Sequence, residues 1–182
     1  MARVLGTAAT PRRWRGEPPA WTFSALSIRR YASADHDTVF ALHRESLAQV
    51  GLHPGDGVYY DDDFAQVEEV YLHAGGEFLV GETGDGIVAI GGLLRVDETV
   101  AEMVRLRVRP SQQGRGYGAA MVTVLEERAV ELGYRVLRAD TTVKQPVALE
   151  LYRSSGWCEI DRRVTGTTVT IYFEKRLTER PP

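Results

Sequence analysis

Apolar and polar residues alternate along residues 102–108, which predicts a strand because successive side chains of a strand point to opposite faces. On strict alternation, one face carries Glu102, Val104, Leu106 and Val108, and the other carries Arg105, Arg107 and Arg109. After residue 117 the apolar spacing changes to three and four residues, which predicts a helix that Gly133 ends. A second strand is expected at residues 135–141. Strand, loop, helix and strand then form one βαβ unit with parallel strands.

Similar patterns predict the remaining elements. Alternating or short apolar runs indicate strands at residues 26–31, 78–81, 87–94 and 168–175, the middle two joined by a tight turn at residues 83–86. Helical spacing indicates helices at residues 35–50 and 61–72, and a short one after Gln145. The chain is therefore expected to be an α/β protein with a mixed sheet of six or seven strands and helices on both faces.

Three glycines lie between the predicted strand and helix of the βαβ unit, at positions 114, 116 and 118. Glycine lets the backbone approach a ligand closely, and the unsatisfied N–H groups at a helix N-terminus attract an anion. Arg115 adds a cation at the mouth of this loop. The sequence therefore predicts a phosphate-binding loop at residues 113–119.

Two families use such a loop. Gly114, Gly116 and Ala119 satisfy a loose dinucleotide-binding pattern, with Asp140 at the end of the next strand. That fold places its fingerprint near the start of repeated βαβ units, however, whereas here about a hundred residues precede the loop. A dinucleotide-binding enzyme is therefore the weaker alternative.

The second family shares two motifs with the chain. Gln113, Gly116 and Gly118 match the Q/R-x-x-G-x-G/A signature of the GNAT superfamily of acetyl-coenzyme A (acetyl-CoA) dependent N-acetyltransferases. Residues 145–157, from Gln145 through the Leu151-Tyr152 pair to Trp157, resemble the later N-x-x-A-x-x-L-Y-x-x-x-G-F segment of that family. Two motifs in the correct order are far more specific than one, and the resemblance covers roughly residues 27–175.

The resemblance implies a GNAT fold at residues 25–178, in which a mostly antiparallel sheet splays between its fourth and fifth strands to admit the pantetheine arm of acetyl-CoA. It also implies that main-chain groups near Leu106 and Val108 hold the pantetheine amides and that the loop holds the pyrophosphate. The expected cofactor-binding residues are Leu106, Val108, Gln113, Gly114, Arg115, Gly116, Tyr117, Gly118, Ala119 and Gln145. Gln145 replaces the asparagine that is common in the family, and Thr141 and Thr142 are alternative donors for that contact.

Two residues are candidates for proton transfer. Glu102 precedes Gln113 at a spacing that resembles the general-base glutamate of GNAT histone acetyltransferases, although a glutamate paired with nearby arginines would look the same. Tyr152 resembles the family tyrosine that protonates the departing thiolate. With ordinary pKa values near 8.5 for a thiol and 10 for a phenol, that transfer is nearly balanced. The alternative for Tyr152 is a core aromatic residue on a short helix.

Composition narrows the setting. The 182 residues suit one domain and include a single cysteine, so no internal disulfide forms and a cytoplasmic location is expected. The sequence has no apolar run long enough to predict a membrane span. Its histidines lack the paired spacing of metal ligands, so no metal site is predicted. Residues 1–24 are basic and aperiodic, and we expect them to be a disordered extension. The full chain has a net charge of −3, and residues 1–24 contribute +3, so the remaining residues carry −3 − 3 = −6. This negative charge argues against nucleic-acid binding.

The sequence therefore predicts an N-acetyltransferase that moves an acetyl group from acetyl-CoA to a small-molecule or protein amine by direct attack in a ternary complex. The sequence does not define the acceptor or the acyl-chain preference. The resemblance to the family adds the expectation of a homodimer. A GNAT-fold module that binds acyl-CoA without turnover is the alternative from a different functional class.

Overall fold

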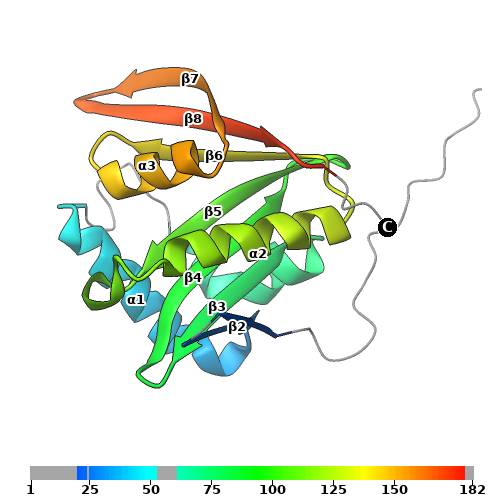
Figure 1. Cartoon of the computed structure of the whole chain (residues 1–182), viewed down its shortest axis with the longest axis vertical. Coiled ribbons are helices and arrows are strands. Elements are labelled where there is room, and N and C mark those ends of the chain that lie inside the picture. The colour runs from blue at the N-terminus through cyan, green and yellow to red at the C-terminus, as the bar shows by residue number, and fades with distance from the viewer. Residues whose placement is uncertain (1–19, 24, 53–60, 179–182) are drawn as a thin grey trace, which may run out of the picture.

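The computed structural model describes residues 20–23, 25–52 and 61–178 (Figure 1). An eight-stranded sheet in the order β1-β2-β3-β4-β5-β6-β8-β7 runs through this part of the chain. Its strands are β1 (Trp21–Phe23), β2 (Leu26–Arg30), β3 (Glu77–Thr83), β4 (Gly86–Arg95), β5 (Val100–Val108), β6 (Val136–Thr142), β7 (Cys158–Thr165) and β8 (Thr168–Arg176). β5 and β6 pair in parallel and the other neighbours pair antiparallel. Within the described residues, β5, the following helix and β6 form one βαβ unit, and the sheet lacks the repeated units that are typical of the dinucleotide-binding fold.

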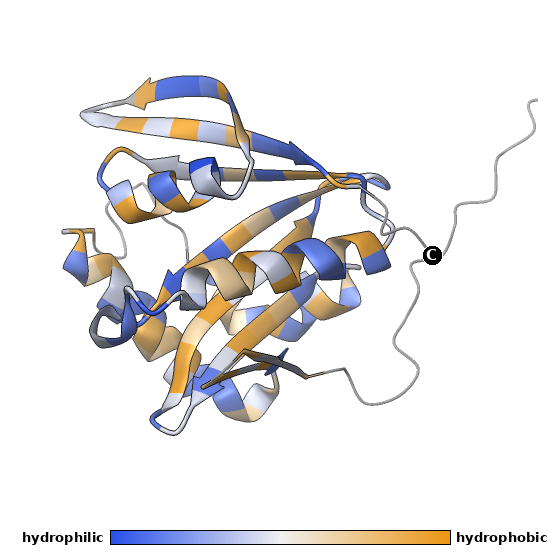
Figure 2. Cartoon of the chain, viewed as in Figure 1, coloured by the Kyte–Doolittle hydropathy of each residue, from blue (hydrophilic) through white to orange (hydrophobic). Residues whose placement is uncertain are grey.

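Helices cover both faces of the sheet. α2 (Tyr117–Glu131) and α3 (Pro146–Ser154) pack on one face, whereas η1 (Ser33–Asp35), α1 (His36–Gln49), η2 (Asp62–Gln66) and η3 (Glu68–His73) lie on the other (Figure 1). Apolar residues concentrate on β3 and β4 at the centre (Figure 2), where residues 77–81 and 87–93 are all buried. Such continuous burial follows from coverage on both faces. Within the described residues, no helix has the length and apolar character of a membrane span.

The parallel pair separates soon after it starts. β5 and β6 pair only at Val100–Val136, Ala101–Leu137 and Glu102–Arg138. Beyond these positions β6 continues along β8, while β5 continues along β4. This is the splay predicted between the strands that flank α2. Beyond the last pair, the facing edges of β5 and β6 border a gap instead of a neighbouring strand.

A β-bulge in β5 corrects the predicted strand faces. Arg105 has φ 57°, and β5 fits two residues opposite Gly91, between the Ile90–Arg107 and Gly92–Val104 pairs. A bulge interrupts the alternation of side chains. As a result, Leu106 packs with α2 whereas Val104 packs in the core on the opposite face, with η3, so the prediction that Glu102, Val104, Leu106 and Val108 share a face is wrong.

Three further predictions need correction. Residues 21–23 form β1, where a disordered extension was expected, because Trp21 packs on the core and its indole Nε1 donates to Glu127 Oε2 at 3.2 Å. The sheet therefore has eight strands rather than six or seven. The helix predicted at residues 61–72 is a 3₁₀ helix (η2) followed by a π-helix (η3). Residues 1–19 and 24 of the predicted extension lie outside the described residues.

A buried carboxylate connects three elements of this fold. Glu77 on β3 is 1% exposed and accepts hydrogen bonds from Arg30 Nη2 on β2 at 2.6 Å and from Arg128 Nε on α2 at 2.7 Å. We expect Glu77→Ala to lower the free energy of unfolding by about 3–5 kcal/mol, because it leaves buried guanidinium charge without its carboxylate. Guanidinium-induced unfolding followed by circular dichroism measures this loss.

The matched control is Glu131→Ala. Glu131 also accepts a hydrogen bond from Arg128, but its side chain is 47% exposed, so the expected loss is about 1 kcal/mol or less. Equal losses for the two variants would show that burial of Glu77 does not determine its contribution.

Candidate active site

The glycine loop lies between a short 3₁₀ helix, η4 (Pro110–Gln112), and the start of α2. Gly114 and Gly116 have φ 76° and 82°, a region that residues with a side chain rarely adopt. Gln113 holds the loop in place, since its Nε2 donates to Val108 O at 3.1 Å and to Gln49 Oε1 of α1 at 2.9 Å. Among the described residues no side chain caps the N-terminus of α2, so its first N–H groups are available to an anion.

This loop forms one end of a cavity of about 560 Å³. All of the predicted cofactor-binding residues except Arg115 line it: Leu106, Val108, Gln113, Gly114, Gly116, Tyr117, Gly118, Ala119 and Gln145. Arg115 is exposed on the loop and lines neither this cavity nor the one described below. The sequence missed the wall that α1 supplies, formed by Ser46 and Gln49 together with Val50, which follows the helix.

The shape and chemistry of this cavity suit a long ligand with an anionic end. The loop offers main-chain N–H groups, while Pro146, Val147 and Leu151 add apolar walls. At Gly118 an added Cβ would lie 3.3 Å from Leu151 Cδ2 and 3.7 Å from Val108 Cγ2, so a side chain there would narrow the cavity beside the loop. These features fit a diphosphate followed by a pantetheine arm.

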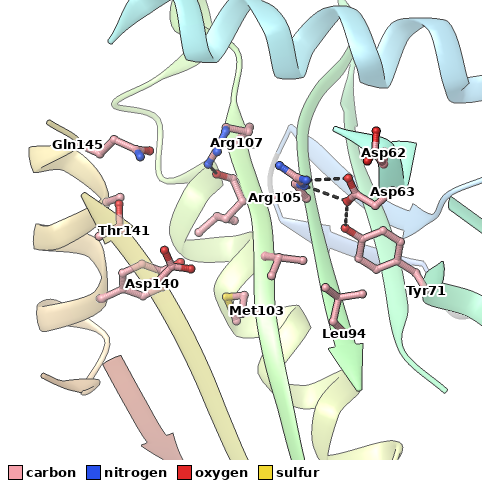
Figure 3. Close-up of a pocket in the computed structure, with 14 residues that line it drawn as sticks. Asp62, Asp63, Tyr71, Leu94, Met103, Arg105, Arg107, Asp140, Thr141 and Gln145 are labelled. Carbon is pink, nitrogen blue, oxygen red and sulfur yellow. Dashed lines mark hydrogen bonds and ion pairs between the residues drawn. The ribbon is translucent and has the colours of Figure 1, made fainter. Parts of the chain in front are cut away.

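A second cavity of about 400 Å³ opens on the side of η2 and η3 (Figure 3). We call it the acceptor cleft, after the role that is proposed for it below. Its walls come from η2, η3, β4, β5, β6 and α3, and its lining includes Asp62, Asp63, Tyr71, Arg105, Arg107, Asp140, Thr141 and Tyr152. The two cavities share Leu106, Arg107, Gln145 and Ala148, so they meet in the gap between β5 and β6.

An ion-pair network forms the wall of the cleft beside η2. Arg105 Nη2 donates to Asp63 Oδ1 at 2.6 Å and Arg105 Nε donates to Asp63 Oδ2 at 2.9 Å (Figure 3). The Tyr71 hydroxyl donates to the same carboxylate, and burial together with Asp63 raises the pKa of Tyr71. The bulge turns Arg105 toward η2. Its side chain can therefore make this bidentate contact with Asp63 and form part of the cleft wall.

His43 of α1 lies behind this network, fully buried, with Nε2 3.0 Å from Asp61 Oδ1. Burial, and secondly the charge of Arg107, lower its pKa to about 4, although the bond to Asp61 acts in the opposite direction. The unfolded chain, with an ordinary histidine pKa near 6.5, binds more protons between these values, so stability falls as the pH drops from about 6.5 to about 4.

We therefore expect His43→Gln, which keeps an N–H donor for Asp61 but does not titrate, to remove about 3 kcal/mol of the acid-induced loss in unfolding free energy. Urea unfolding at several pH values between 4 and 7 measures the difference. His73→Gln, at an exposed position on η3, is the control and should follow the wild-type profile. Parallel profiles for wild type and His43→Gln would contradict the assignment.

The two predicted proton-transfer residues lie at different depths. Tyr152 is 3% exposed, packs on Trp157 and Phe173 with ring centroids 5.2 and 5.3 Å away, and lines the acceptor cleft. Glu102 is half-buried and lies at the last paired position of β5 and β6. Burial, and secondly Asp140, raise the pKa of Glu102. Glu102 does not line either cavity in the described part of the chain.

The mixed sheet, the splayed β5–β6 pair and the glycine loop at α2 together define an acetyltransferase-type α/β fold. The sequence model of the acetyltransferase (GNAT) family matches residues 28–157, which is more than half of the chain. The chain therefore belongs to the GNAT family of acetyltransferases.

Curated relatives carry N-acetyltransferase names. The uncharacterized N-acetyltransferase YjgM of Escherichia coli is 24% identical over 154 residues, which cover 82% of this chain and 92% of that protein. N-acetyltransferase 8F1 of Rattus norvegicus is 29% identical over 106 residues, or 56% of this chain. This match spans 48% of the rat protein, so the chain corresponds to about half of its length.

Solved structures share the fold. An acetyltransferase from Streptococcus agalactiae superposes with a TM-score of 0.75 and 19% identity, covering 85% of this chain and all of that one. The putative acetyltransferase yncA from Salmonella typhimurium, solved with its cofactor acetyl-CoA, gives a TM-score of 0.72 and 18% identity, covering 87% of this chain and 98% of that one.

Proposed function

We propose that this protein transfers an acetyl group from acetyl-CoA to a primary amine. The observation that carries the proposal is the junction of the two cavities between β5 and β6. A long ligand anchored at the glycine loop would reach this junction from one side, and an acceptor in the cleft would reach it from the other. Binding two reactants in contact is what direct transfer in a ternary complex requires.

For acetyl-CoA, the proposal assigns the pyrophosphate to the N–H groups of Gly116 to Ala119 and the pantetheine arm to the walls formed by Val108, Gln145 and Leu151. The buried hydroxyl of Thr141, 4% exposed, has no hydrogen-bond partner among the described residues, and Thr141 lines the cleft. Such an atom fits a contact with a bound ligand, in place of the family asparagine that this chain replaces with Gln145.

The bound thioester supplies an activated acyl carbon and a thiolate leaving group. The chain must then remove a proton from the amine and supply one to sulfur. An alkylamine with a pKa of about 10.4 must first lose its proton, which costs about 4.6 kcal/mol at pH 7. Glu102 and Asp140 are the carboxylates beside the β5–β6 gap, and Tyr152 is the hydroxyl donor that lines the cleft.

Calorimetric titration of CoA, acetyl-CoA and NAD tests the ligand class. We expect binding of acetyl-CoA and CoA but not of NAD. An amine panel then tests turnover, with an alkyl diamine, an amino acid, an aminoglycoside and a peptide that has a free N-terminus and a lysine. We expect CoA thiol to appear with at least one amine. Tight acetyl-CoA binding without thiol release from any amine would instead favour the binding-module alternative.

A further inference from the structure

Asp140 extends from β6 toward β5 at the point where the two strands have separated (Figure 3). Its main chain pairs with Tyr172 of β8, so β8 holds the residue in place while its other side faces the gap. The side chain lines the acceptor cleft and is exposed to solvent there. An acceptor amine in the cleft therefore has direct access to this carboxylate.

Two of the other acidic residues near the cleft have partners, and the third, Asp62, is exposed on η2, on the wall opposite β6 (Figure 3). Asp63 is occupied by Arg105 and Tyr71, and Asp61 is occupied by His43. Asp140 makes no ion pair with any residue in the described part of the chain, and its single hydrogen bond is to its own backbone. Partial burial raises the pKa of its carboxyl, with Arg107 and Arg105 opposing. A higher pKa strengthens a carboxylate as a proton acceptor.

Glu102 is less well placed for the same task. It lies one step before the strands separate, opposite Arg138, and outside the lining of both cavities among the described residues. Asp140, by contrast, shares the acceptor cleft with Tyr152, the hydroxyl donor of the proposed function. A carboxylate and a phenol that line the same cleft can serve as base and acid in one transfer.

We propose that Asp140, rather than Glu102, is the catalytic base that takes the proton from the acceptor amine. This inference rests on the proposed acetyl transfer. The ammonium form of the acceptor first loses one proton to the Asp140 carboxylate. The neutral nitrogen then bonds to the acyl carbon as the carbon–sulfur bond breaks; nitrogen gives its second proton to water, and sulfur gains one from the Tyr152 hydroxyl. Exchange with solvent then deprotonates Asp140 and reprotonates Tyr152.

The test compares wild type, Asp140→Asn and Glu102→Gln, using the alkylamine of the panel that gives the highest wild-type rate. We expect Asp140→Asn to lower kcat by at least about 100-fold, the usual contribution of a positioned base, while acetyl-CoA affinity stays unchanged. Glu102→Gln should stay within about fivefold of wild type. With an arylamine, which is already neutral at pH 7, the loss in Asp140→Asn should shrink to less than about tenfold.

A pH profile supplies a second readout. The rate of wild type should rise with pH through an acidic limb that Asp140→Asn lacks and Glu102→Gln retains. The charged or titratable groups around Asp140 are Glu102, Arg105 and Arg107 on β5, Arg138 on β6, Tyr172 on β8, with which its main chain pairs, and Asp62, Asp63, Tyr71 and Tyr152, which line the same cleft. Glu102→Gln controls for the carboxylate of this set whose pKa Asp140 raises.

The outcomes separate this inference from the proposed function. Thiol release by wild type that survives in Asp140→Asn, or a large loss confined to Glu102→Gln, would overturn the inference and leave acetyl transfer intact. An equal loss with alkylamine and arylamine would assign Asp140 to structure rather than to proton transfer. Acetyl-CoA binding without thiol release by wild type for any amine would refute the proposed function, and this inference with it.

Discussion

Replacing Gly116 with glutamate is expected to weaken acetyl-CoA binding by about 100-fold or more, equal to about 2.7 kcal/mol. Two effects act together. Gly116 has φ 82°, so any side chain strains the loop, and the new carboxylate would lie where the first N–H groups of α2 face the pyrophosphate. An anion already attached at that site repels the diphosphate that the site is proposed to hold. Calorimetric titration of acetyl-CoA into each variant measures the change.

Gly133→Glu is the matched control for this substitution. Gly133 lies just beyond the opposite end of α2 and also has a positive φ, of 95°. At both glycines an added Cβ would have no other group of the described structure within 4 Å. Both variants therefore carry similar backbone strain, of about 1–2 kcal/mol, and the same new charge. Only Gly116→Glu should lose acetyl-CoA. If both variants bind equally well, the pyrophosphate does not occupy the glycine loop.

Tyr152→Phe is expected to lower kcat by about 10²–10³, because the thiolate would leave without a positioned proton donor. The ring should keep its packing on Trp157 and Phe173, so acetyl-CoA affinity should change little. The loss should therefore appear in kcat and not in the dissociation constant. Initial rates of thiol release at saturating acetyl-CoA, with the best amine of the panel, measure it.

Tyr134→Phe provides the comparison for loss of a buried hydroxyl. Tyr134 is 6% exposed and donates to Gly75 O at 2.8 Å, and it lines neither cavity in the described structure. This variant should lose about 1 kcal/mol of stability and retain its rate. If Tyr152→Phe retains the wild-type rate, Tyr152 is not the proton donor. It would then be the core aromatic residue that the sequence analysis gave as the alternative.

The parts of the fold that local patterns encode were predictable. The alternation at residues 102–108, the helical spacing of α2 and the glycines between them define a βαβ unit from neighbouring residues alone. Almost all of the predicted cofactor-binding residues consequently line one cavity. The two motifs indicated the GNAT family, and the family model that matches residues 28–157 confirms it.

The acceptor cleft was harder to predict because it depends on contacts between distant segments. The bulge at Arg105 carries no sequence signal, since glycine is the usual residue at a positive φ, and it moved Leu106 to the face opposite Val104. The Arg105–Asp63 pair joins residues 42 positions apart. Asp140 was noted only for the dinucleotide pattern, and nothing in its neighbourhood showed that β5 ends its pairing before reaching it.

Amine-dependent release of CoA thiol by the wild-type chain is the direct test of acetyl transfer. Acetyl-CoA is supplied at saturation, and thiol and acetylated amine are measured together for each amine of the panel. We predict that the two products appear in equal amounts with at least one amine and that Gly116→Glu releases both far more slowly at the same acetyl-CoA concentration. Thiol release that is independent of every amine, or none above the spontaneous rate, would contradict the claim that the two cavities form an acetyltransferase site.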